Sequence, residues 1–121
     1  ELWIVAPEIT ADRPSIPETV HLLKQEYESS VCQGAFLVLA ATDDKELNAR
    51  ICRDGRAAGA FVNNASDHEQ CDFYFPSIIR DEQKVIGLNG GGMDHRGTKE
   101  LRKKVEQVLE ISAEKSVYDG E

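Results

Sequence analysis

The sequence predicts an α/β fold built around parallel strands. Apolar runs of strand length recur through the first half of the chain, and segments with helical periodicity separate them. The chain has 121 residues, of which 40% are hydrophobic and 30% charged, and this is the size and composition of one ordinary folded domain. Strands that alternate with helices favour a parallel sheet, because parallel neighbours need a crossover connection.

The first elements are predicted as a strand, a helix and a short edge strand. Residues 2–6 form a continuous apolar run, as expected for a strand buried on both faces. Apolar residues at helical spacing predict a helix over residues 15–24, with Pro17 in its first turn. Weak alternation over residues 25–28 predicts a short edge strand.

The next strand–helix–strand unit has the strongest pattern. Residues 35–41 are continuously apolar and predict a buried strand. Asp43 is followed three residues later by Glu46, which indicates the N-cap of a helix with a capping box. That helix is predicted to end at Gly59, and residues 60–63 are predicted as the following strand.

The second half of the chain predicts a strand pair and a helix. Residues 73–79 and 85–88 are predicted as two strands around a polar turn. A glycine run at 90–92 links them to an amphipathic helix. The apolar stripe of this helix consists of Leu101, Val105, Val108 and Leu109.

The glycine run is close to a phosphate-binding loop but does not match one. In such a loop a lysine directly follows the second glycine and precedes the threonine, whereas here Thr98 comes before Lys99. Asp94 also stands where a phosphate would bind, and His95 replaces the third glycine of a dinucleotide motif. A flexible link between strand and helix is therefore the favoured interpretation.

Charge and cysteine content limit the function classes. Fourteen basic against twenty-two acidic residues give a net charge of −8, which argues against nucleic acid or an anionic membrane as the main partner. A small-molecule enzyme or binding domain is favoured. Cys32, Cys52 and Cys71 lack the spacing of a zinc site or a disulfide framework, so we expect no metal site and a reducing, cytoplasmic environment.

Polar residues follow three predicted strands, at residues 7–8, 42–44 and 63–68. Ligands of open parallel sheets bind beyond the carboxyl ends of the strands. Each segment alone is as easily a helix cap or a turn, but together they predict a site. An acidic residue such as Glu8 can bind ribose hydroxyls. His68 is either a candidate acid or base or an exposed turn residue.

Several segments, read in order, resemble the precorrin-2 dehydrogenase / sirohydrochlorin ferrochelatase family of siroheme synthesis. The similarity extends from the first residue to about Glu110, and its most specific parts are the A-A-T-D-D and F-x-x-P-S-I-I segments. The segments that carry it are residues 5–9, 34–44, 47–48, 63–67 and 73–79.

The resemblance implies an NAD-binding Rossmann-like domain over residues 1–68 and a dimerisation extension over residues 69–121, made of a strand pair and a helix. Members of the family oxidise precorrin-2 to sirohydrochlorin with NAD, and many also insert ferrous iron. The implied partners are therefore a tetrapyrrole substrate and a second copy of the chain.

The resemblance also implies site residues. The positions that match cofactor contacts are Pro7, Glu8, Ala41, Thr42 and Asp43. The positions expected to line the tetrapyrrole pocket, and to carry the chemistry, are Ser66, Asp67 and His68. Basic contacts to the carboxylates of the substrate are expected from Arg80, Arg96 and Lys99.

Two departures from the family pattern shape the prediction. The family's first strand and glycine-rich turn are absent, which leaves residues 2–6 without a neighbour on one side and predicts a fragment or an unrecorded first segment. The family's C-terminal helical domain is likewise missing or cut short. Ser66 stands where the family has an aspartate credited with both chemistries, and a serine without an activating partner is no general base.

The sequence therefore predicts that the full-length protein is mainly a dehydrogenase whose chelatase activity is weak or absent. This chain alone is either the active part of that enzyme or an inactive fragment of it. One alternative is a non-catalytic dimerising or regulatory domain, derived from this family, that has lost cofactor binding. Another is an unrelated NAD-binding regulatory domain.

Overall fold

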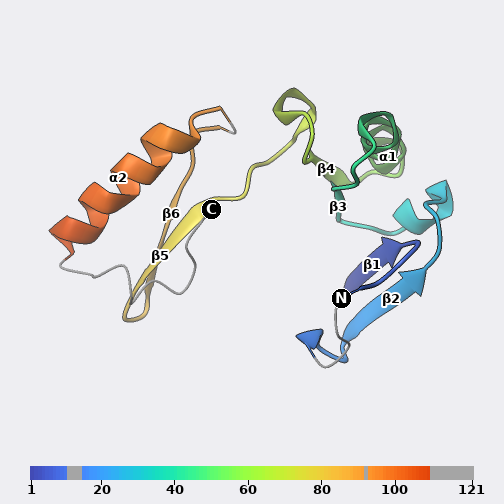
Figure 1. Ribbon diagram of the computed structural model, residues 1–121, viewed down its shortest axis with the longest axis horizontal. Coiled ribbons are helices and arrows are strands. Elements are labelled where there is room, and N and C mark those ends of the chain that lie inside the picture. Colours follow the sequence, from blue (N-terminus) through green and yellow to red (C-terminus); the bar gives the residue numbers. More distant parts are fainter. Residues whose placement is uncertain (11–14, 92, 110–121) are drawn as a thin grey trace.

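Within the described residues, 1–10, 15–91 and 93–109, the computed structural model has six strands arranged in pairs. Figure 1 shows β1–β4 with α1 on one side of the molecule and β5, β6 and α2 on the other. The strands are β1 (Leu2–Ala6), β2 (Val20–Lys24), β3 (Leu37–Ala40), β4 (Phe61–Asn64), β5 (Ser77–Asp81) and β6 (Lys84–Leu88). The helices are α1 (Lys45–Ala57) and α2 (His95–Val108), with short 3-10 turns η2 (Ser29–Cys32) and η3 (His68–Gln70).

Two of the strand pairs are parallel, which confirms the predicted α/β class. β1 pairs with β2 from Leu2 opposite Val20 onward, and β3 pairs with β4, joined through α1 as a crossover unit. In the described part of the chain, β1 and β3 are not hydrogen-bonded to each other. The two pairs are therefore separate ribbons, not the one continuous sheet that the sequence predicted.

The helix predicted over residues 15–24 is wrong. Val20–Lys24 form β2, and a turn closed by a hydrogen bond from the Val20 N–H to the Pro17 carbonyl (3.0 Å) precedes it. Residues 25–28 are not a strand either, and they lead into η2. A short apolar segment is compatible with the residue spacing of a helix and with that of a strand. Here the parallel pairing of residues 20–24 with β1 stabilises the strand.

The N-cap of helix α1 lies one residue later in the sequence than predicted. Asp44, not Asp43, is the N-cap, and its carboxylate accepts hydrogen bonds from the N–H groups of Glu46 (3.0 Å) and Leu47 (3.2 Å). These bonds satisfy donors that have no partner inside the helix. The predicted end is confirmed, since Gly59 has a φ of 87°, a conformation that suits glycine, before β4 begins.

The main core lies between α1 and the β3–β4 pair. Its buried members are Ala40, Ile51, Cys52 and Val62. Gly55 lets the helix approach the strands closely, because a Cβ there would lie 3.0 Å from a methyl group of Val62. Cys32 and Cys52 are buried, and burial raises the pKa of the Cys52 thiol.

The C-terminal unit is an antiparallel hairpin covered by α2, and it has the predicted order of elements. β5 pairs with β6 from Ser77 opposite Leu88 to Asp81 opposite Lys84. The buried face of α2 is polar, however, and consists of Arg102 and Glu106. Of the apolar stripe, Leu101 is 49% exposed and Val108 is 82% exposed, whereas Val105 and Leu109 are half-buried. No helix among the described residues is long and apolar enough to cross a membrane.

Asp72, in the segment after β4, is hydrogen-bonded to the backbone of that strand. Its carboxylate accepts a hydrogen bond from the Val62 N–H (2.8 Å) and lies 3.3 Å from an Arg56 guanidinium nitrogen. The backbone hydrogen bond, and then the Arg56 charge, lower the pKa of Asp72. Asp72 is therefore ionised more readily in the folded chain than in the unfolded chain.

Replacing Asp72 by asparagine should lower the stability at neutral pH. A lowered folded-state pKa contributes stability above the unfolded pKa of about 3.9, and this contribution is lost as the pH falls through the folded-state value. Urea unfolding of the chain and of Asp72→Asn should show a larger difference in stability at pH 7 than near pH 3. An equal difference at both pH values contradicts the assignment. Glu69→Gln, which removes an exposed acid, is the control.

Candidate functional site

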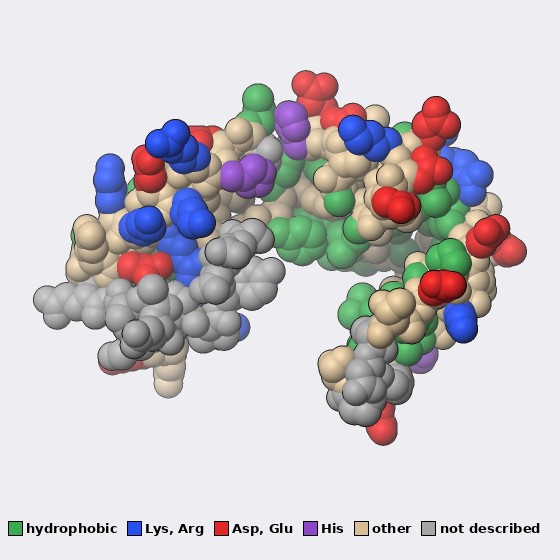
Figure 2. Space-filling view, in the orientation of Figure 1, with side chains coloured by type: hydrophobic (Ala, Val, Ile, Leu, Met, Phe, Trp, Pro, Cys, Tyr) green, Lys and Arg blue, Asp and Glu red, His purple; other side chains and the backbone are tan. Residues whose placement is uncertain are grey.

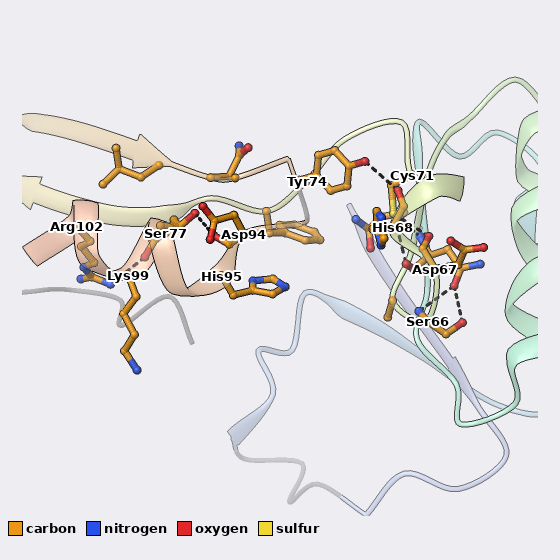
Figure 3. Close-up of a pocket in the computed structure, with 18 residues that line it drawn as sticks. Ser66, Asp67, His68, Cys71, Tyr74, Ser77, Asp94, His95, Lys99 and Arg102 are labelled. Carbon is orange, nitrogen blue, oxygen red and sulfur yellow. Dashed lines mark hydrogen bonds between the residues drawn. The ribbon is translucent and has the colours of Figure 1, made fainter.

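A cleft of about 800 Å³ lies between the end of β4 and the unit that contains α2. Figure 3 shows Ser66, Asp67 and His68 at one end, Tyr74 in the middle, and His95, Lys99 and Arg102 at the other end. Pockets of this size suit ligands larger than a simple metabolite. The lining residues are Asn63, Asn64, Ala65, Ser66, Asp67, His68, Cys71, Tyr74, Phe75, Ser77, Leu88, Asn89, Gly90, Asp94, His95, Thr98, Lys99 and Arg102.

The three residues predicted to line a tetrapyrrole pocket lie together on this cleft. Ser66, Asp67 and His68 occupy the turn that follows β4. The residues predicted to contact a cofactor do not line this cleft. Pro7 and Glu8 follow β1, and residues 41–43 follow β3. The cleft thus contains the predicted substrate residues but none of the predicted cofactor residues.

A buried asparagine connects the turn after β3 with the turn after β4. Asn48, on α1, accepts hydrogen bonds at Oδ1 from the backbone N–H (2.9 Å) and hydroxyl (2.7 Å) of Thr42. Its Nδ2 donates to the hydroxyl of Ser66 (3.1 Å), which donates in turn to Asn64 Oδ1 (2.8 Å). Thr42 and Ser66 are therefore joined, whereas Glu8 has no hydrogen bond or ion pair to either turn among the described residues.

Asp67 and His68 differ in how free their side chains are. Asp67 caps η3, since its Oδ1 accepts from the Glu69 N–H (3.0 Å). His68 is exposed, and its carbonyl accepts from the hydroxyl of Tyr74 (2.9 Å). The His68 imidazole has no hydrogen bond or ion pair within the described part of the chain. It is therefore available to a ligand in the cleft.

The opposite wall is formed by α2 and the segment before it. Asp94 caps the helix by accepting from the Gly97 N–H (2.8 Å), so its carboxylate occupies the helix terminus where a phosphate would bind. Lys99 lines the cleft and forms no ion pair among residues 1–10, 15–91 and 93–109. Of the three predicted basic contacts, Arg80 and Arg96 do not line the cleft.

Arg102 is a cleft residue that sequence reasoning missed. It is 6% exposed, its Nε lies 2.7 Å from an oxygen of Glu106, and its Nη1 donates to the Ser77 hydroxyl (3.1 Å). Figure 2 shows Lys and Arg side chains gathered on the side of the molecule that carries α2. Among the described residues that line this wall, Lys99 is thus the cation without an ion pair, since Arg102 is paired with Glu106.

The residues after β1 have the chemistry that the ribose of a dinucleotide requires. Glu8 is exposed, follows the carboxyl end of a parallel strand, and has no hydrogen bond or ion pair within the described residues. A free carboxylate at this place can accept hydrogen bonds from both ribose hydroxyls. Glu8 therefore fits the ribose end of a nicotinamide cofactor.

Comparison with known proteins identifies the family of the chain. The model of a family described as "Putative NAD(P)-binding" matches residues 1–77, which supports a nicotinamide dinucleotide as the cofactor. Siroheme synthase of Actinobacillus succinogenes is 35% identical over 90% of this chain and 23% of its own length. Siroheme synthase 1 of Pectobacterium atrosepticum is 37% identical over 77% of this chain and 19% of its own length.

A solved structure shares the fold. The protein named "SirC, precorrin-2 dehydrogenase" superposes with a TM-score of 0.70 at 15% identity, over 88% of this chain and 53% of that protein. The chain spans less than a quarter of the length of the two siroheme synthases. Because the family model matches well over half of its residues, the chain belongs to this NAD(P)-binding family, and the relatives confirm the resemblance to siroheme-synthesis enzymes seen in its sequence.

Proposed function

We propose that the chain binds NAD⁺ and catalyses the oxidation of precorrin-2 to sirohydrochlorin. The observation that carries the proposal is the cleft itself, in which Ser66, Asp67 and His68 face a wall with Lys99 and His95. The cleft adjoins the β4 end of a unit of an NAD(P)-binding family. The names of the similar proteins, siroheme synthase and precorrin-2 dehydrogenase, add support.

The proposed reaction removes two hydrogens from the tetrapyrrole. One leaves a ring carbon as hydride, and the other leaves as a proton, so that precorrin-2 and NAD⁺ give sirohydrochlorin, NADH and H⁺. NAD⁺, when bound, supplies the hydride acceptor. The free imidazole of His68 can accept the released proton. Lys99 pairs with carboxylates of the substrate and holds the ring across the cleft.

Metal insertion is proposed to be weak or absent. It requires a base for the pyrrolic protons, and the hydroxyl of Ser66 is already engaged, donating to Asn64 and accepting from Asn48. One carboxylate oxygen of Asp67 already accepts the hydrogen bond that caps η3.

The test is an anaerobic assay of this chain in two parts. Precorrin-2 with NAD⁺ should produce NADH and sirohydrochlorin, and sirohydrochlorin with ferrous iron should give little metallated product. NAD⁺ binding without turnover, or no binding at all, overturns the proposed activity in favour of a non-catalytic domain. Robust iron insertion that Ser66→Ala abolishes overturns the proposed lack of chelatase activity.

We also propose that residues 1–68 form the NAD-binding part, and that residues 69–121 contain the surface of a cytoplasmic homodimer. Three exposed apolar side chains of α2 and β6 support the dimer, namely Leu101 (49%), Val108 (82%) and Val85 (56%). Apolar surface of this kind is a common feature of subunit interfaces. The free thiols of all three cysteines suit a reducing compartment. Residues 110–121 of the proposed extension lie outside the described residues.

Replacing both Leu101 and Val108 by glutamate should convert a dimer into a monomer. Two charges on each helix would have to be buried without partners at the interface, and each is costly. Sedimentation velocity at several concentrations measures the change, and Phe36→Glu, on an exposed residue before β3, is the control. A chain that is monomeric before any substitution contradicts the proposal.

A further inference from the structure

The side chain of Asn48 lies between the turn after β3 and the turn after β4, and both polar atoms of its amide are hydrogen-bonded. It is 0% exposed, although asparagine on a helix usually faces water. Oδ1 accepts the two hydrogen bonds from Thr42, and Nδ2 donates to the Thr42 carbonyl (3.0 Å) and to the Ser66 hydroxyl (3.1 Å). Both acceptor sites and both donor hydrogens of the amide are therefore used.

The orientation of the Asn48 amide is fixed by its neighbours. The Thr42 N–H can only donate and the Thr42 carbonyl can only accept, so Oδ1 must face the first and Nδ2 the second. This orientation sets the direction of the bonds that follow. Nδ2 donates to Ser66, and the Ser66 hydroxyl must then donate onward to Asn64 Oδ1 at 2.8 Å.

The chain of bonds continues to the far side of the turn after β4. The Ser66 N–H also donates to Asn64 Oδ1 (3.0 Å), and Asn64 Nδ2 donates to Gln70 Oε1 (3.2 Å). Asn64 is only 3% exposed. Each group donates to the next, and such a series polarises its members and resists rearrangement.

Asn48 is thus the side-chain connection between two turns with different proposed tasks. Thr42 belongs to the turn after β3, proposed to lie against the cofactor, and Ser66 begins the turn that carries Asp67 and His68 into the cleft. The backbone also joins these strands, from the Ala65 N–H to the Ala40 carbonyl (2.9 Å). Asn48 extends that connection past the strand ends, where the reactants would meet.

We propose that Asn48 is a positioning residue, which fixes the turn at Thr42 relative to the turn at Ser66 so that the tetrapyrrole is held at hydride-transfer distance from the nicotinamide. This inference rests on the proposed function. Asn48 touches neither reactant and acts through Thr42 and Ser66. A small misplacement of reacting groups reduces the rate strongly while binding is retained.

The test compares Asn48→Leu with Leu47→Ala in the dehydrogenase assay of this chain. Asn48→Leu keeps the size but removes all four hydrogen bonds, and it should lower kcat per folded molecule by roughly tenfold to a hundredfold. The KM values for NAD⁺ and precorrin-2 should change less than about threefold. Asn48→Asp keeps the shape but loses the donated bonds to the Thr42 carbonyl and the Ser66 hydroxyl, and it should share the loss of kcat.

Leu47→Ala is the control for stability. It removes a half-buried contact to the same core from the neighbouring position of α1, without touching the network. It should lower stability and leave kcat per folded molecule unchanged. Hydrogen exchange provides a second readout, because the Thr42 N–H should lose protection in Asn48→Leu and keep it in Leu47→Ala.

The outcomes separate the inference from the function on which it rests. If the unchanged chain does not reduce NAD⁺ with precorrin-2, the proposed function and the inference both fall. If the unchanged chain is active and Asn48→Leu keeps its kcat within twofold, or loses no more than Leu47→Ala does, only the inference is overturned.

Discussion

Arg102→Met should destabilise the hairpin and helix at the C-terminal side of the cleft by about 3–5 kcal/mol, because breaking a buried ion pair strands a charge. Arg102 and Glu106 are 6% and 9% exposed, and Nε and Oε1 lie 2.7 Å apart. Without the guanidinium, the Glu106 carboxylate stays buried without its partner, and the Ser77 hydroxyl loses a donor. Urea unfolding followed by circular dichroism, with hydrogen exchange in α2, measures the loss.

The same helix supplies a control with the same spacing. Arg96 and Glu100 are also four residues apart and lie 3.7 Å apart, but their side chains are 93% and 65% exposed. Arg96→Met should therefore cost less than about 0.5 kcal/mol. The double substitution Arg102→Met with Glu106→Leu should recover most of the loss, since it leaves no buried charge. Equal losses for Arg96→Met and Arg102→Met contradict the assignment.

The contrast between these two pairs shows why the cleft was only partly predictable. In sequence, the Arg102–Glu106 pair and the Arg96–Glu100 pair have the same spacing and charges. Burial separates them, and burial depends on how α2 lies on the hairpin, which helical periodicity does not report. The apolar stripe of α2 indicated the neighbouring face, with Leu101 and Val108, as the inner one, because an apolar stripe usually faces the chain's own core.

The burial of Asn48 was partly predictable from the sequence. It lies on the same helical face as Ile51 and Cys52, three and four residues later, so a polar residue interrupts an apolar stripe. That interruption indicates a satisfied buried amide or a functional residue. Its partners Thr42 and Ser66 could not be predicted, because they lie on two other loops that only the folded chain brings to α1.

The fold was predictable where several local signals agreed. The strand before α1, the acidic cap near its start and Gly59 at its end all indicate one strand–helix–strand unit, and the structure contains it. The segment around β2 lacked such agreement. Residues 20–24 fit a helix and a strand equally well, and their parallel pairing with residues 2–6, distant in sequence, decided the outcome.

Glu8 should make the chain prefer NAD⁺ over NADP⁺, and Glu8→Gln should reduce that preference roughly a hundredfold. The phosphate that distinguishes NADP⁺ is on the ribose hydroxyl that an acidic residue at this place binds. Two like charges about 4 Å apart repel by about 4 kcal/mol near a protein surface, and solvent around the exposed Glu8 reduces this repulsion. A remaining repulsion of about 2.8 kcal/mol corresponds to a hundredfold in affinity. Calorimetric titration with each cofactor measures the preference without any turnover.

Two further variants separate the local contact from the general charge of the chain. Glu8→Arg should reverse the preference, because a guanidinium pairs with the 2′-phosphate. Glu82→Gln removes one exposed acid from the turn between β5 and β6 and should leave the ratio of the two affinities unchanged. A ratio that Glu8→Gln and Glu82→Gln shift equally would show that net charge, and not the carboxylate after β1, selects the cofactor. A ratio that Glu8→Arg leaves unchanged would place the ribose away from Glu8.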